Sequence, residues 1–292
     1  MRSNNSHDFL PEFRSEFTAD LNHAMEQYPV SLPGWAVVDL IHITDHAVLY
    51  LARNKKNKQA VIKRFNYSIT HLEDQHIHDF IETVDAIRAI GFGGLVDIYH
   101  TGLSSDAFYL LMEYLGNGNL AQIISIGLEE VSLQQRHDWF QDILISVGTL
   151  HDAGLLHRDL KPSNVMFRDN NELVLVDCGI ESDWLIKTGF ISEGEVYCTP
   201  NYVSPERAAG ESCDVRAEIY SLGAMFYELL TGSKPYEATN MVGLMKRHAL
   251  APIPQLPKES MRYQKVLNKM LAKHPDGRYQ SIDEALDDLY FV

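Results

Sequence analysis

Hydrophobic and polar residues alternate along much of the first part of this chain. The alternation runs through residues 35–50 and returns at residues 109–114, as expected of half-buried β-strands. Residues 49–52 and 61–63 flank a lysine-rich polar run, which predicts a hairpin with a solvated turn. Between these strands, residues 69–90 carry apolar side chains at helical spacing and predict a single helix.

Beyond residue 115 the apolar positions follow the helical period instead. Residues 134–152 predict a long amphipathic helix closed by Gly154, because glycine is favoured just past a helix end. Residues 216–231 are apolar almost throughout, which indicates a buried helix. Shorter helices are expected at residues 238–248, 260–272 and 281–289. Strands followed by helices predict an α+β protein with two unequal lobes.

Residues 1–33 precede this pattern and predict a helix of their own. Five apolar residues recur there at spacings of three and four, namely Leu10, Phe13, Phe17, Leu21 and Met25. Pro11 suits the first turn, where its missing N–H costs nothing. The apolar stripe has two interpretations: it packs on the chain's own small lobe, or it docks a partner protein.

Composition and charge narrow the class of protein. The chain has 292 residues, enough for one large domain or two lobes, and a formal net charge of −15. That charge argues against binding to nucleic acid or to an anionic membrane. The three cysteines, Cys178, Cys198 and Cys213, suit neither a disulfide framework nor a metal site. Since no apolar run reaches the length of a membrane span, we expect a cytoplasmic protein.

Residues 157–164, with the sequence His-Arg-Asp-Leu-Lys-Pro-Ser-Asn, combine a carboxylate, a lysine and an amide in one loop. Phosphoryl transfer needs such a set: a carboxylate that orients and deprotonates a hydroxyl, a cation near the γ-phosphate, and an oxygen ligand for a metal ion. The run resembles the catalytic loop of the eukaryotic-type (Hanks-type) protein kinases, and the chain is most similar to bacterial serine/threonine kinases.

Further motifs of that family follow in the expected order. They are Val61–Lys63, the Asp177-Cys178-Gly179 triplet, residues 198–202 and 204–206, residues 219–223, and Arg278. The resemblance covers residues 35 to 290. It implies a bilobal kinase domain at 34–292, with a β-rich N-lobe containing one helix (34–114) and a larger, mainly helical C-lobe (115–292). Residues 1–33 are then an N-terminal helical extension.

The resemblance also implies a role for each site residue. Asp159 would orient the acceptor hydroxyl and take its proton, and Lys161 would neutralise the moving phosphoryl group. Lys63 would hold the α- and β-phosphates of ATP. Asn164 and Asp177 would supply oxygen ligands to Mg²⁺ or Mn²⁺, hard cations that prefer oxygen.

Adenine and the strand lysine need partners as well. By resemblance, Met112 is the gatekeeper, and Glu113, Tyr114 and Leu115 offer backbone groups to adenine. Glu82 is expected to form the salt bridge to Lys63. Asp85 is the alternative partner.

Other family positions bear on specificity and regulation. Lys161, and Thr199 bridging it to Asp159, are typical of serine/threonine kinases. Arg158 indicates activation by phosphate on the segment 177–206, which offers Ser182, Thr188, Ser192, Tyr197 and Thr199. Glu193 and Glu195 either pair with Arg158 without modification or simply solvate the loop. A buried ion pair between Glu206 and Arg278 is expected to support that segment.

Three departures from the family pattern stand out. His42, Thr44 and Ala47 occupy the glycine positions of the phosphate loop, so close approach of the backbone to phosphates is harder. Cys178 replaces a phenylalanine and is expected to be a small buried hydrophobe. Glu218 replaces an aspartate that braces the catalytic loop, and its carboxylate reaches one methylene further.

The chain is therefore predicted to be a serine/threonine protein kinase that transfers the γ-phosphoryl group of ATP to a protein substrate, and to be a phosphoprotein itself. The alternative is a pseudokinase that binds nucleotide or partner proteins with little transfer. A small-molecule phosphotransferase of related fold is a third, weaker hypothesis.

Overall fold

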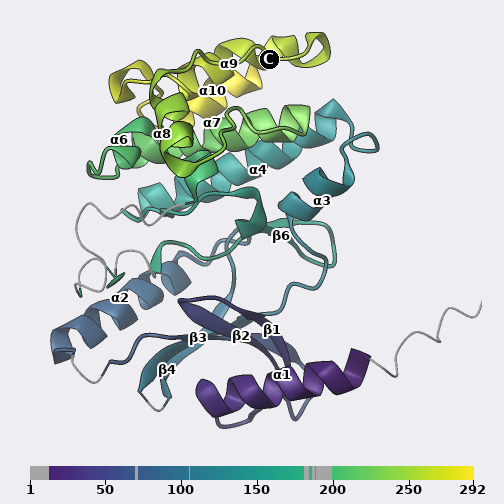
Figure 1. Ribbon diagram of the computed structural model, residues 1–292, viewed down its shortest axis with the longest axis vertical. Helices are drawn as coiled ribbons and strands as arrows, with labels where there is room; N and C mark the ends of the chain where they lie inside the picture. The colour runs from purple at the N-terminus through teal and green to yellow at the C-terminus, as the bar shows by residue number, and fades with distance from the viewer. Residues whose placement is uncertain (1–12, 70–71, 105, 181–183, 186–187, 189–198) are drawn as a thin grey trace, which may run out of the picture. The chain divides into compact units, whose positions relative to one another are not determined.

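The computed structural model describes residues 13–292 except 70–71, 105, 181–183, 186–187 and 189–198 (Figure 1). Contacts divide the chain into two compact units. The first consists of Met1–Ile81 and Asp97–Tyr114, and the second of Glu82–Val96 and Leu115–Val292. The second unit begins its main segment at residue 115, as the predicted C-lobe does. The N-terminal extension belongs to the first unit, and residues 82–96 belong to the second.

The first unit is built on a five-stranded antiparallel sheet in the order β1-β2-β3-β5-β4. Its strands are β1 (Trp35–Ile43), β2 (Ala47–Asn54), β3 (Gln59–Phe65), β4 (Ile98–Ser104) and β5 (Ala107–Glu113). The predicted hairpin is β2–β3, in which Leu49 pairs with Lys63. β4 was not predicted from the sequence. Its residues 99–103 are all partly or fully exposed, so they show no alternation of apolar and polar side chains.

Helix α1 (Phe13–Gln27) packs against this sheet (Figure 1). The Tyr50 hydroxyl on β2 donates to the carbonyls of Ala24 at 3.0 Å and Tyr28 at 2.9 Å. Leu21 and Met25 of the predicted stripe contact the sheet's core, whereas Leu10 and Pro11 lie outside the described residues. These contacts match the interpretation in which the helix covers the chain's own small lobe.

Helix α2 (Asp74–Ile90) begins five residues later than the pattern predicted. Its Phe80 stacks on Phe108 of β5 at 4.1 Å between ring centroids and meets Phe65 of β3 edge-on at 5.5 Å. Aromatic packing of this kind fastens the first half of the helix to the sheet.

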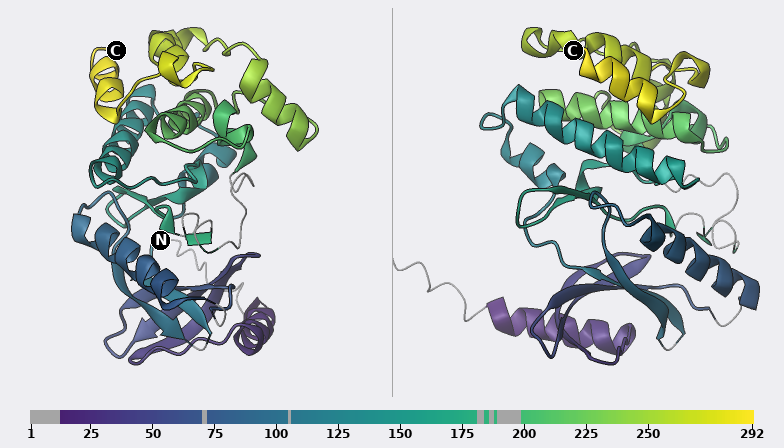
Figure 2. Two further views of the ribbon diagram at one scale, coloured as in Figure 1. Left: turned by 90° about the vertical axis from the view of Figure 1, so that its left-hand side faces the viewer. Right: turned by 180° about the vertical axis from the view of Figure 1, so that it is seen from behind.

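The second unit is mainly helical. Its helices include α3 (Leu120–Ile126), α4 (Leu133–Asp152), α6 (Pro205–Ala208), α7 (Val215–Thr231), α8 (Met241–Leu250), α9 (Gln264–Met270) and α10 (Ile282–Tyr290), and a two-stranded sheet joins β6 (Val165–Phe167) to β7 (Leu173–Leu175). The predicted buried helix is α7, whose Phe226 stacks on Phe140 of α4 at 3.9 Å. Helix α10 also packs against α4 (Figure 2).

Two predicted helices differ in detail from the structure. The helix expected at 238–248 is α8, which begins later because the Asn240 side chain caps it by accepting the Gly243 N–H at 2.8 Å. The helix expected at 260–272 is a 3₁₀ segment, Lys258–Tyr263, followed by α9. The sheet and the mainly helical unit confirm the predicted α+β class. None of the helices that the structure describes is both long and apolar enough to cross a membrane.

Candidate active site

In the loop between α4 and β6, the predicted site residues Lys161 and Asn164 contact the carboxylate of Asp159. The Lys161 Nζ lies 2.5 Å from Asp159 Oδ2. The Asn164 Nδ2 donates to the Asp159 carbonyl at 2.8 Å and to Oδ2 at 3.3 Å. The Thr199 hydroxyl, forty residues away in sequence, donates to Asp159 Oδ1 at 2.9 Å. The predicted contact of Thr199 with Asp159 is thus present, and both carboxylate oxygens are engaged.

The environment of Asp159 favours its ionised form. Burial by itself raises the pKa of this carboxyl, but the Lys161 ammonium and the hydrogen bonds from Lys161 and Thr199 outweigh burial and lower the pKa below its ordinary value. The group is therefore an acceptor-only carboxylate at neutral pH.

The backbone of the catalytic loop is strained and is held by a distant carboxylate. Arg158 has a φ of 67°, in the left-handed region that L residues rarely adopt. Its N–H donates to Glu218 Oε1 on α7, and its carbonyl accepts from Arg207 at 2.6 Å. The other Glu218 oxygen accepts from His151 Nε2 at 2.7 Å. The longer side chain of Glu218 therefore still braces the loop.

Glu218 is a buried carboxylate, so its negative charge needs hydrogen bonds or nearby positive groups to offset the loss of water. Burial raises the pKa of this carboxyl, but the hydrogen bond from His151, the nearby imidazoles and the Arg158 N–H lower it overall. Neither His151 nor Arg207 was predicted as part of the site. Their contacts join segments 49 to 67 residues apart, and no local pattern reports such a pairing.

The Asp177 segment is tied to the same loop. The Val176 N–H donates to the Asn164 carbonyl at 2.9 Å, and the buried His157 ring bonds the Val176 carbonyl at 2.9 Å. Asp177 itself has a φ of 61°. Gly179 has a φ of 68°, and a Cβ there would lie 2.1 Å from the Leu156 carbonyl oxygen, so only glycine fits. These contacts place the two predicted metal ligands on adjoining segments.

The donor set of Asn164 and Asp177 fits a hard divalent cation. Asn164 donates to Asp159 through its amide nitrogen, and its side chain also carries a carbonyl oxygen. Asp177 is exposed and offers carboxylate oxygens. Amide and carboxylate oxygens are the ligands that Mg²⁺ and Mn²⁺ prefer.

Two further predictions concern packing around the site. Cys178 is buried, and burial raises the pKa of its thiol far above the ordinary range, so it is the inert hydrophobe that was expected. Arg278 and Glu206 form the predicted buried ion pair, with bidentate contacts of 2.6 and 2.7 Å. Burial raises the pKa of Glu206, but Arg278 lowers it more.

Lys63 and Glu113, two of the residues predicted to bind nucleotide, lie in the first unit. Lys63 is buried on β3, with Leu49 and Leu110 opposite it on the neighbouring strands. The Glu113 N–H donates to the Asp97 carbonyl at 2.9 Å. Leu115 and Glu82 belong to the second unit. The pairing of Glu82 with Lys63 therefore stays a prediction.

The turn between β1 and β2, where the phosphate loop was predicted, is closed by contacts of Thr44. The Thr44 hydroxyl accepts the N–H groups of Ala47 at 3.0 Å and His46 at 3.3 Å. The Thr44 N–H donates to the Ala47 carbonyl at 2.9 Å. Three N–H groups at the position of a phosphate loop are thus used within the turn.

Part of the predicted regulatory segment is not placed by the structure. Ser182, Ser192, Glu193, Glu195, Tyr197 and Cys198 lie outside the described residues. Thr188 is described, and its hydroxyl donates to the Trp184 carbonyl at 2.7 Å.

Comparison with known proteins places this geometry in a family. Residues 45–291 match the protein kinase domain family. A probable serine/threonine-protein kinase of Clostridium acetobutylicum is 28% identical over 87% of this chain and 39% of its own length. The serine/threonine-protein kinase PknB of Mycobacterium leprae is 32% identical over 70% of this chain and 34% of its own length. The chain thus spans less than half the length of these relatives.

Solved structures show the same fold. The kinase domain of Mycobacterium tuberculosis PknI covers 90% of this chain with a TM-score of 0.67 and 20% sequence identity, and the match includes 98% of that domain. A cysteine-to-alanine mutant of the same PknI domain matches with the same TM-score.

Proposed function

The chain belongs to the protein kinase family, and we propose that it is a serine/threonine kinase that transfers the γ-phosphoryl group of ATP to a protein hydroxyl. The observation that carries the proposal is the Asp159 carboxylate, which is kept ionised by Lys161 and oriented by Thr199. A carboxylate held in this way is suited to orient an acceptor hydroxyl and to take its proton.

The neighbouring residues divide the remaining work. Lys161 places a cation beside the catalytic carboxylate, where it neutralises charge on the transferred group. In this proposal Lys63 binds the α- and β-phosphates, and the Glu113 carbonyl and the Leu115 backbone bind adenine. Asn164 and Asp177 would hold Mg²⁺ or Mn²⁺, which when bound supplies positive charge to the phosphate oxygens. Catalysis is then mainly positioning and electrostatic stabilisation.

Two observations favour an active enzyme over a pseudokinase. The carboxylate, lysine and amide of the catalytic loop contact one another, and the strained Arg158 backbone is held by Glu218. Strain of this kind is retained where surrounding contacts over-determine it, commonly at functional sites. The Glu206–Arg278 pair supports the segment that follows Thr199, which favours a protein substrate over a small molecule.

Transfer of radiolabelled phosphate from ATP tests the proposal. The chain is incubated with Mg²⁺ or Mn²⁺, with and without a general protein acceptor, beside Asp159→Asn. The Asp287→Asn variant, which changes an exposed carboxylate on α10, is the matched control. We expect labelled phosphoserine or phosphothreonine with the wild type and the control, and none with Asp159→Asn. Nucleotide binding with no transfer by any of the three proteins would favour the pseudokinase.

We further propose a cytoplasmic location. Cys178 and Cys213 are free thiols in the structure, which suits a reducing compartment. The proposed transfer also needs a supply of ATP. Cells are lysed under denaturing conditions, without reductant and in the presence of an alkylating agent. Alkylation of both cysteines would support this proposal. Recovery of both as oxidised thiols would contradict it.

A further inference from the structure

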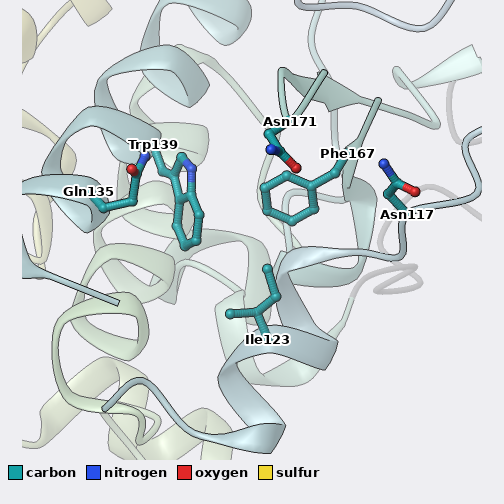
Figure 3. Close-up of a pocket in the computed structure, with 6 residues that line it drawn as sticks. All are labelled: Asn117, Ile123, Gln135, Trp139, Phe167 and Asn171. Atoms are coloured by element: carbon teal, nitrogen blue, oxygen red, sulfur yellow. The ribbon is translucent and has the colours of Figure 1, made fainter. Parts of the chain in front are cut away.

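A pocket of about 250 Å³ lies in the second unit, apart from the catalytic loop's carboxylates (Figure 3). Helices α3 and α4, strand β6 and the two adjoining turns contribute to it. Its lining residues are Asn117, Ile123, Gln135, Trp139, Phe167 and Asn171. None of these six residues is assigned a role in phosphoryl transfer.

The wall of the pocket is aromatic and apolar. Trp139 and Phe167 meet edge-to-face at 5.4 Å between ring centroids, and Ile123 lies across from them (Figure 3). Trp139 and Ile123 are partly exposed, so apolar surface remains open to a ligand. A single aliphatic side chain is of a size that fills such a space.

The polar part of the lining consists of three amides and no charged group. Asn117, Gln135 and Asn171 are exposed, and Asn117 is anchored through its Nδ2, which donates to the Arg168 carbonyl at 3.0 Å. An amide side chain offers both donors and an acceptor, the complement of a peptide N–H and C=O. The pocket therefore suits an apolar side chain together with the peptide groups beside it.

Two carboxylates adjoin the pocket on α4. Asp138 lies three residues after Gln135, and Asp142 lies three residues after Trp139, so each is a neighbour of a lining residue on the helix surface. Neither forms an ion pair with a cation in the part of the chain that the structure describes. Burial raises the pKa of Asp142, and the negative charge of Asp138 raises it further. A pair of like charges without a counterion favours a cationic ligand.

The pocket is connected directly to the catalytic loop. Strand β6 begins at Val165, one residue after Asn164, and ends at Phe167 in the pocket. A ligand bound here is thus held on the same compact unit as Asp159. If the ligand is part of a longer chain, its binding raises the effective concentration of a hydroxyl elsewhere in that chain.

We propose that this pocket docks a segment of the protein substrate in which Lys or Arg lies close in sequence to Leu, Ile, Met or Val. The apolar residue enters between Ile123, Trp139 and Phe167, and the cation meets Asp138 and Asp142. Helical neighbours are about 5–6 Å apart and an extended chain advances about 3.3 Å per residue, so the apolar residue and the cation lie about two positions apart in the segment. The identity of the ligand as a substrate rests on the proposed kinase function.

Binding is tested first, without ATP. A phage-displayed library of random dodecapeptides is selected on the purified chain, and the affinity of the enriched synthetic peptides is measured by fluorescence anisotropy. We expect basic–apolar pairs among the enriched peptides. The Asp138→Lys/Asp142→Lys variant should weaken their binding about tenfold or more, and Ile123→Ala about fivefold, because charge attraction and buried apolar area are lost. Asp287→Lys, a charge reversal on α10, should change it less than about twofold.

Several outcomes would overturn the docking proposal. One is a selection that enriches no such pair, and another is peptides that bind the pocket variants as well as the wild type. A third is sedimentation of the chain as a dimer that Ile123→Ala dissociates, because the pocket would then pair two copies. If the charge-reversed variant is unfolded by circular dichroism, Asp138→Asn/Asp142→Asn replaces it and should still weaken binding severalfold.

Transfer is tested second. A selected peptide is joined by a flexible linker to a serine acceptor, and its phosphorylation is compared with that of the same acceptor carrying an alanine-substituted peptide. We expect the KM to fall about tenfold with kcat unchanged, and the fall to disappear in the charge-reversed variant. An unchanged KM would overturn the substrate assignment. Peptide binding without transfer to any acceptor would instead count against the kinase function and leave the docking site standing.

Discussion

Glu218 and His151 are hydrogen-bonded at 2.7 Å although 67 residues separate them in sequence. The second oxygen of the same carboxylate accepts the N–H of Arg158, the residue before Asp159, for which we propose the catalytic role. One buried side chain on α7 thus connects the end of α4 to the strained backbone of the catalytic loop. The glutamate side chain is long enough to reach both partners.

Glu218→Ala is expected to lower both stability and transfer. The change leaves a buried N–H and a buried imidazole without their acceptor, at a cost of about 1–3 kcal/mol for each unsatisfied group. We expect the urea midpoint to fall and kcat to fall with it, since Arg158 loses its support. Glu218→Asp keeps the carboxylate and should lose less of both. A kcat that is the same in Glu218→Ala as in the wild type would contradict the bracing role.

Lys63→Met is expected to abolish transfer and to leave the fold intact. The lysine lies at a buried position on β3, where the methionine chain has a similar volume, so no cavity opens. The melting temperature should stay within a few degrees of the wild type. Lys56→Met, in the exposed turn between β2 and β3, is the matched control and should remain active. Full activity in Lys63→Met would refute the phosphate-binding assignment.

Thr199→Val removes the hydroxyl that orients Asp159 while keeping the shape of the side chain. A hydrogen bond to a charged group contributes about 1.5–3 kcal/mol, so a decrease in kcat of about tenfold or more is expected. Thr199→Ser retains the hydroxyl and should retain most of the activity. Steady-state kinetics of the three proteins make the comparison, and equal kcat values for valine and threonine would count against an orienting role.

The Thr44→Gly/Ala47→Gly variant is expected to bind ATP more tightly than the wild type. The Thr44 hydroxyl holds the N–H groups of His46 and Ala47 within the β1–β2 turn, and glycine at position 44 releases both. Each charge-assisted bond to phosphate is worth about 1.5–3 kcal/mol, so one new bond lowers the ATP constant about tenfold or more. Nucleotide titration decides the matter. Low-micromolar binding by the wild type that glycine does not improve would show that the turn is not limiting.

Glu206→Gln should destabilise the second unit in a pH-dependent way. The folded pKa of Glu206 lies below its ordinary value of 4.5, so the ion pair stabilises the protein above that pH. The stabilisation is lost as pH falls through the lowered folded pKa. At neutral pH, removal of one partner costs about 3–5 kcal/mol, because Arg278 is left buried without its counterion. Melting curves of both proteins should therefore converge at acid pH; a constant difference would show that this carboxyl does not titrate as stated.

Short-range patterns predicted much of the fold. The apolar period of residues 134–152 located α4, and the nearly continuous apolar run at 216–231 located α7, because a helix buries residues at a spacing that the local sequence displays. The hairpin β2–β3 was predicted from two apolar strand segments that flank a polar, lysine-rich turn. Short or exposed elements were missed: β4, β6, β7 and α3 are too brief or too exposed to carry a clear period.

The sequence by itself determined the family and the candidate site residues of the catalytic loop, since Asp159, Lys161 and Asn164 lie within six consecutive residues. Only the tertiary structure decided what holds them. Thr199, Glu218 and Arg207 approach the loop from segments 40 to 60 residues away, and the pocket at Trp139 and Phe167 joins segments that are also distant in sequence. Such contacts arise when burial of apolar surface folds distant segments together, and a local pattern of residues records the burial of each segment but not its partner.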